Sequence, residues 1–261
     1  MRNVLTIVGK EMRSYFVSPV AYVVLTGFLL LGGWFFFNLL SRFNLLLSLY
    51  TQFQGQAGAG GAADQLNLND FVIAPLMNNL SIILVILVPM ITMRAFAEEK
   101  KGGTYELLLT SPLRTGEIVL GKFVASFLFI CIMIGLTAIY PLLLWWFGNP
   151  EVGVMISGYM GLLMMATAFV AVGLFTSSVT ENQIIAAVSG LVAMLLLYII
   201  GWPAQGAGDI LGPILKYMSV TDHFSELVKG VIDTRALVYF ASLTGLALFL
   251  TMRSVESLRW R

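Results

Sequence analysis

The chain has 261 residues, of which 58% are hydrophobic and 11% are charged, and its formal net charge is +1. Soluble domains contain about 45–50% apolar and about 25% charged residues, so this composition excludes an ordinary soluble domain. A net charge this close to zero gives no reason to expect nucleic acid or an acidic substrate as a partner.

Long windows without a charged residue define the predicted membrane spans. They are Ser14–Ser41, Phe71–Met93, Phe123–Pro150, Val152–Thr180, Asn182–Gly208 and Ala236–Met252. A helix needs about 20 apolar residues to cross the hydrocarbon, and a helix satisfies its own backbone there. We therefore predict one all-α integral membrane domain, residues 1–261, with spans at 17–40, 72–97, 117–147, 153–178, 183–203 and 235–252.

The first sixteen residues have an amphipathic pattern. On a helical wheel an apolar face opposes a polar one: Leu5, Val8, Met12 and Phe16 against Asn3, Thr6, Lys10 and Arg13. This pattern is typical of a helix that lies in the membrane interface. The alternative is a charged topology signal with no further role. We predict an interfacial helix over residues 1–16, characterised by Lys10, Met12, Arg13 and Phe16.

Two sequence features lie next to or within the second predicted span. Before it, the glycine-rich run GQAGAGGAADQ predicts a flexible external loop. Within it, Pro89 predicts a kink or a frayed last turn near the end of the span.

A charged segment, Arg94–Lys122, lies between the second and third predicted spans and contains nine charged residues. Gly102 and Gly103 are expected to end its first helix. Thr115 is expected to cap the next helix, with Glu117 in the first turn, where the helix dipole favours an anion. A water-facing, helix-forming segment between spans predicts a surface that another protein contacts.

Three leucines, Leu107, Leu108 and Leu109, lie in the middle of this charged segment. Exposed leucines in a charged frame favour a partner surface. The alternative is that they pack on the chain's own helices or dip into lipid.

The distribution of lysine and arginine predicts the orientation. Eleven of these residues fall in the N-terminus, the second loop and the tail, whereas Arg42, Lys216, Lys229 and Arg235 are on the opposite side. The positive-inside rule therefore predicts that both termini and the Arg94–Lys122 segment are cytoplasmic. Residues 204–234, with several glycines and prolines, are then external, and we expect short re-entrant helices there.

Residues with catalytic or metal-binding potential are few. The sequence Gly116–Lys122 fits G-x-x-x-x-G-K, but Phe123 stands where a P-loop needs serine or threonine, and no strand precedes it. The single histidine, His223, has only Asp222 beside it, whereas a metal site needs three or four ligands. We expect no catalytic residue, cofactor or metal in this chain.

The run EEKKGGTYELLLTSPLRTGEIVLGK resembles the cytoplasmic loop of ABC-2 type transporter permeases. The start, KEMRSYFVSPVAYV, and the end, HFSELVKGVIDTRALVYFASLTGLALFLT, are most similar to the gliding-motility GldF-like permease subgroup. The resemblance covers nearly the whole chain.

This resemblance implies a function and a set of partners. In that family the loop, here residues 98–116, carries a coupling helix that docks on a separate ATPase subunit. A second permease chain, identical or homologous, an accessory envelope protein and the lipid bilayer are the other implied partners. The residues implied in docking are Glu98, Glu99, Thr104, Tyr105, Glu106, Leu107, Leu108, Leu109, Thr110, Ser111 and Pro112.

The implied role is that of a non-catalytic permease subunit in a bacterial inner membrane. It would use ATP hydrolysed by the partner to export or extrude an amphiphilic or envelope-related substrate, or for envelope work such as gliding motility. An ion-coupled secondary transporter is the alternative, but such proteins usually hold charges at mid-membrane, and the predicted spans have none there. A membrane enzyme would need a buried reactive group, which the spans also lack.

Overall fold

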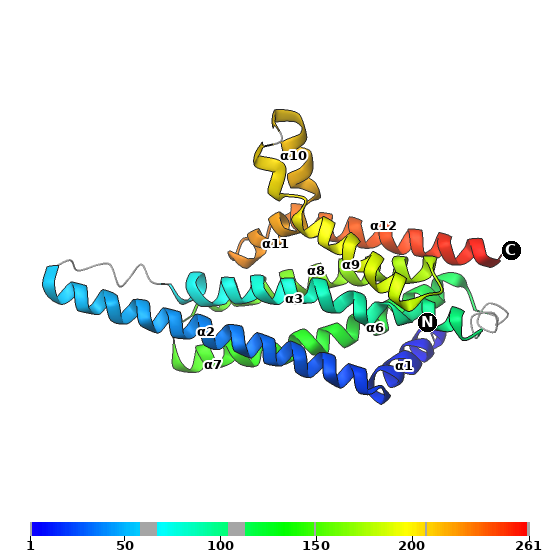
Figure 1. Cartoon of the computed structure of the whole chain (residues 1–261), viewed down its shortest axis with the longest axis horizontal. Coiled ribbons are helices and arrows are strands. Elements are labelled where there is room, and N and C mark those ends of the chain that lie inside the picture. The colour runs from blue at the N-terminus through cyan, green and yellow to red at the C-terminus, as the bar shows by residue number, and fades with distance from the viewer. Residues whose placement is uncertain (1, 58–66, 104–112, 149, 207, 260–261) are drawn as a thin grey trace.

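The computed structural model describes residues 2–57, 67–103, 113–148, 150–206 and 208–259. Within these ranges the protein is all-helical, and six helical stretches are long and apolar enough to cross a membrane. The prediction of an all-helical protein with six apolar spans is confirmed at this level. Figure 1 shows most of the long helices lying side by side along the longest axis of the molecule.

The elements follow one another as a series of helices, several of them interrupted. They are α1 (Arg2–Val17), α2 (Pro19–Ala57), η2 (Asn69–Ile73), α3 (Ala74–Thr92), α4 (Arg94–Lys101), α6 (Thr115–Thr137), α7 (Ile139–Phe147), α8 (Val152–Val179), α9 (Gln183–Ile199), η3 (Trp202–Gly206), α10 (Gly208–Met218), α11 (Val220–Val228) and α12 (Thr234–Arg259).

Helix α8 is the central helix of the bundle. Helices α3, α4, α6, α9, α11 and α12 all pack against it. Small residues allow this close approach: a Cβ added to Gly161 would lie 3.0 Å from Leu227, and one added to Gly173 would collide with the hydroxyl of Thr92. Close packing of small residues is a main source of helix association in lipid, where the hydrophobic effect between helices is absent.

Two of the long helices are interrupted within four residues of a proline. The second span breaks at Met93, four residues after Pro89, and the third breaks at Ala138, three residues before Pro141. Proline lacks an N–H and its ring clashes with the turn before it, which weakens the helical hydrogen-bond ladder at Ala138, in the turn before Pro141. Met93 instead follows Pro89, and its N–H still donates to the Pro89 carbonyl at 2.9 Å. The first break separates α4 from α3.

Helix α2 is longer than the span predicted from the sequence. The prediction ended the span at residue 40, but the helix continues to Ala57 for a total of 39 residues. At about 1.5 Å per residue it is about 58 Å long, nearly twice the thickness of the hydrocarbon. From Phe43 to Gln54 the sequence is leucine-rich and contains neither glycine nor proline, which favours this extension. Residues 58–66 of the predicted glycine-rich loop lie outside the described residues.

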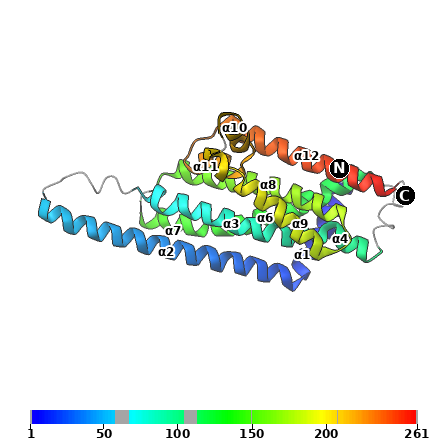
Figure 2. The ribbon, with the colours of Figure 1, turned by 45° about the horizontal axis from the view of Figure 1, so that its top comes forward.

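The two ends of the bundle carry different parts of the chain. Figure 1 and Figure 2 place both termini, α1, α4 and the start of α6 at one end, and the far end of α2, η2 and α7 at the other. Helix α1 lies at an angle to the long helices and crosses the first of these ends.

The region between the fifth and sixth spans contains η3, α10 and α11. Helix α11 packs against α8 and buries Phe224 and Leu227, and its N-cap is Ser219, whose hydroxyl accepts from the Asp222 N–H at 3.2 Å. Helix α10 instead projects away from the bundle (Figure 1) and leaves Ile210 80% exposed. The expected re-entrant position of these helices relative to a membrane stays a prediction.

Candidate functional site

Three segments that are far apart in the sequence meet at the end of the molecule that carries the termini. Helix α1 packs along α6, and a Cβ added to Gly121 of α6 would lie 2.7 Å from the side chain of Ile7. Gly121 therefore allows an approach that a larger residue would prevent. The end of α4 lies beside them, and we call the meeting point of α1, α4 and α6 the cytoplasmic junction, after its expected side of the membrane.

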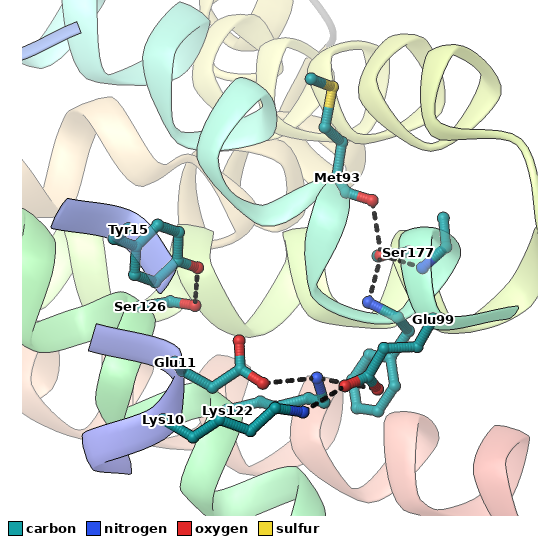
Figure 3. A network of polar contacts seen from close by, with 10 residues as sticks. Lys10, Glu11, Tyr15, Met93, Glu99, Lys122, Ser126 and Ser177 are labelled. Atoms are coloured by element: carbon teal, nitrogen blue, oxygen red, sulfur yellow. Dashed lines mark hydrogen bonds and ion pairs between the residues drawn. The ribbon is translucent and has the colours of Figure 1, made fainter. Parts of the chain in front are cut away.

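A network of ion pairs connects the three helices of the junction (Figure 3). The Lys122 Nζ of α6 lies 2.9 Å from Glu11 Oε1 of α1 and 2.9 Å from Glu99 Oε2 of α4. The Lys10 Nζ of α1 lies 3.2 Å from the other oxygen of Glu99. Each of the three helices thus contributes at least one charge to the same network.

The burial of these groups makes the network energetically important. The Lys122 side chain is 2% exposed, and those of Glu11 and Glu99 are 15% and 14% exposed. The Lys122 ammonium also lies 5.3 Å from the centre of the Phe96 ring. A buried charge is tolerated only when it is paired, so separating these helices would leave a charge without its partner.

Neutral contacts add to the attachment of α1. The Tyr15 hydroxyl lies 2.9 Å from Ser126 Oγ, and its ring stacks on Phe129 with ring centres 5.1 Å apart. Removal from water raises the pKa of Tyr15 to about 12, because burial disfavours the charged phenolate. The Asn3 amide donates to the carboxylate of Glu117 at 3.3 Å, near the start of α6.

Helix α4 is fixed to the bundle at the break after α3 (Figure 3). The backbone N–H groups of Phe96 and Ala97 donate to Ser177 Oγ of α8 at 3.1 and 3.2 Å. The same hydroxyl donates to the Met93 carbonyl at 2.9 Å. One serine of α8 therefore satisfies backbone groups that the interrupted helix cannot pair itself.

Two further side chains extend this contact to the sixth span. The Lys100 ammonium of α4 donates to the Ser178 carbonyl at the end of α8. The Ser254 hydroxyl of α12 donates to the same carbonyl at 3.2 Å. Helix α4 is thereby connected to α8 and, through that carbonyl, to α12.

The predicted docking segment lies between α4 and α6. Gly102 follows the last residue of α4, and Gly103 has a φ of +69°, a conformation that favours glycine. The expected cap at Thr115 is wrong: Arg114 is the N-cap of α6, and its N–H donates to Glu117 at 3.2 Å. The docking residues Thr104 to Pro112 lie outside the described residues.

The other predicted site residues have different environments. Glu99 and Lys10 belong to the ion network, whereas Glu98 is exposed. Met12 is half-buried and packs against the core, Phe16 packs edge-on against Phe129 with ring centres 5.9 Å apart, and Arg13 is exposed.

Part of the predicted apolar face of α1 is wrong. Leu5 is 71% exposed, and Ile7 and Val8 are the buried residues of this helix. The helical wheel predicts the periodicity of α1, but it cannot show from which side α6 packs against this helix.

Sequence reasoning missed Lys122, Glu11, Ser126 and Ser177 as members of the site. One signal was available for Lys122, because it is a lone cation one turn inside an apolar run. The hydrogen bonds of Ser126 and Ser177 had no comparable signal, since serine is common in apolar helices.

Within the part of the chain that the structure describes, no three His, Cys, Asp or Glu residues lie close enough together to hold a metal ion. The junction connects α4 and α6, the helices that precede and follow residues 104–112, to α1, α8 and α12.

Comparison with curated proteins finds no match to this chain. A family model described as ABC-2 family transporter protein matches residues 5–255, nearly the whole chain. That match agrees with the six apolar helices and with a multi-pass membrane protein, and in this family the ATPase is a separate subunit. The chain belongs to the ABC-2 family of transporter proteins.

Proposed function

We propose that this chain is the permease subunit of an ABC transporter whose ATPase docks on residues 104–112, the segment that follows α4 and precedes α6. The observation that carries the proposal is the anchoring of both flanks of that segment. On one side α4 is bonded to Ser177, and on the other α6 is held to α1 and α4 through Lys122. A segment fixed at both flanks is suited to transmit force, because neither end can yield independently.

The proposed orientation places both termini and the cytoplasmic junction in the cytoplasm of a bacterium, with the chain in the inner membrane. The excess of lysine and arginine in these parts of the sequence supports this orientation. Their position at one end of the bundle is consistent with an even number of spans.

The proposed assembly contains two permease chains and two ATPases. Exposed apolar side chains on α10, which projects from the bundle, support a contact with a second permease chain there. The proposed work is export or extrusion of an amphiphilic or envelope-related substrate, or force on envelope components, as in gliding motility. Stimulation of the ATPase by an isolated amphiphile would favour transport, whereas stimulation by an envelope protein would favour mechanical work.

The proposal is tested by Leu108→Asp in a chain co-expressed with its ATPase. We expect the variant to insert normally but to lose co-purification of the ATPase and most of the membrane-dependent stimulation of ATP hydrolysis, because a carboxylate would replace an apolar docking contact. Val231→Asp, which is 59% exposed and lies between α11 and α12, is the matched control and should retain the ATPase. Full co-purification and full stimulation with Leu108→Asp would contradict docking through this segment.

A further inference from the structure

A cavity of about 490 Å³ lies beside the ion network, between α1, the start of α2, the α3–α4 break and α6. Its lining is polar at one end and apolar at the other. Arg94, Glu98, Ser14 and Ser18 are among the polar lining residues, and Val20, Val24, Met90 and Ile91 are among the apolar ones. A cavity with this division fits an amphiphile better than a wholly polar or a wholly apolar molecule.

The charges around the cavity leave one cation and one anion without an ion-pair partner. Lys10, Lys122, Glu11 and Glu99 neutralise one another in the ion network. Among the described residues, Arg94 and Glu98 take part in no salt bridge. These two residues are four apart on α4, so their side chains lie on the same face of that helix.

Arg94 has hydrogen-bonding capacity to spare. Its Nη1 makes one long contact, 3.5 Å, to Ser18 Oγ, and its buried Nε has no hydrogen-bond partner. A guanidinium offers five N–H donors and binds phosphate oxygens in a bidentate manner, and a buried donor without a partner costs free energy. A phosphate group in the cavity would satisfy this requirement.

The apolar part of the cavity is accessible from the side of the bundle. Val20 is 37% exposed and Met90 is 43% exposed. Both residues lie on the apolar helices α2 and α3, close to their ends at the cytoplasmic junction. An acyl chain could therefore enter between α2 and α3 while its headgroup stays near Arg94.

We propose that this cavity holds a zwitterionic aminophospholipid, with its phosphate on Arg94, its ammonium on Glu98 and an acyl chain along Val24 and Ile91. The cation and the anion that remain around the cavity match the two charges of such a headgroup in number and sign. The inference rests on the proposed membrane placement of this end of the bundle, but it does not require the ATPase. A failure of ATPase docking and a failure of lipid binding are therefore separate results.

The test is native mass spectrometry of the purified full-length chain, with any co-purifying subunit, after incubation with phosphatidylethanolamine or phosphatidylglycerol. The unaltered protein should retain one phosphatidylethanolamine per chain in preference to phosphatidylglycerol. Arg94→Gln should weaken that retention by about tenfold or more, since it removes charge-assisted hydrogen bonds. Glu98→Gln should keep lipid binding but remove the preference for the amine.

Two further variants test whether the effect belongs to the cavity. Lys101→Gln removes a cation at the same end of the molecule from an exposed residue that does not line the cavity, and it should leave retention unchanged. Ala21→Leu adds volume to the apolar lining and should reduce retention while leaving every charge in place. Equal retention by Arg94→Gln, an equal loss with Lys101→Gln, or displacement of the lipid by inorganic phosphate would each overturn the proposal.

Discussion

The Lys122 ammonium lies 2.9 Å from carboxylate oxygens of both Glu11 and Glu99, while its side chain is 2% exposed. The charge of Lys122 is therefore both paired and removed from water. The three residues come from three different helices, and Lys122 is 111 residues from Glu11 in sequence. The sequence places Lys122 where the charged segment meets an apolar run, and nothing in it shows that α1 returns to cover this residue.

At the residue scale we predict that Lys122→Met lowers the free energy of unfolding by about 3 kcal/mol, because it leaves Glu11 and Glu99 partly buried without their cation. Thermal melting in mild detergent measures the effect. The triple change Lys122→Met, Glu11→Gln and Glu99→Gln should be less destabilising than the single change. Arg253→Gln removes an exposed pair and should change stability by about 0.5 kcal/mol or less. Unchanged melting of Lys122→Met would show that the network contributes nothing.

At the element scale, the position of α4 depends on its backbone contact with α8. Pro89 indicated an interruption near this position, and the structure has one at Met93. The partner that satisfies the freed backbone groups, Ser177, lies 81 residues after Phe96. Periodicity describes each helix separately, so it can predict where a helix ends but not which neighbour bonds to its exposed backbone. The six apolar spans were predictable for the same reason, since each depends on its own sequence alone.

We predict that Ser177→Ala loosens α4 without unfolding the bundle. The change removes the acceptor of the Phe96 and Ala97 N–H groups and the donor to Met93, which should cost about 1–3 kcal/mol. Hydrogen exchange at the Phe96 and Ala97 amides should accelerate by about tenfold or more, while exchange in the middle of α8 stays slow. Ser189→Ala is the control, because that hydroxyl donates within its own helix to Ala186. Equal exchange in both variants would contradict the role given to Ser177.

At the scale of the whole molecule, the described helices form one bundle around α8 with the termini and the cytoplasmic junction at the same end. The contacts of α4 with α8 and, through the Ser178 carbonyl, α12 connect the helix that precedes residues 104–112 to the fourth and sixth spans. The windows without charge predicted that six apolar spans exist. They could not predict these contacts, because the contacts join side chains to backbone groups that are distant in the sequence.

The most direct test of the account is photo-crosslinking from single positions in the complex purified with its ATPase. A photoreactive residue at Leu108 should capture the ATPase, because the proposed contact with the ATPase lies in residues 104–112. A photoreactive residue at Ile210 of α10, which is 80% exposed, should not capture it. Capture from Ile210 with none from Leu108 would contradict the claim that energy enters this chain through the segment between α4 and α6.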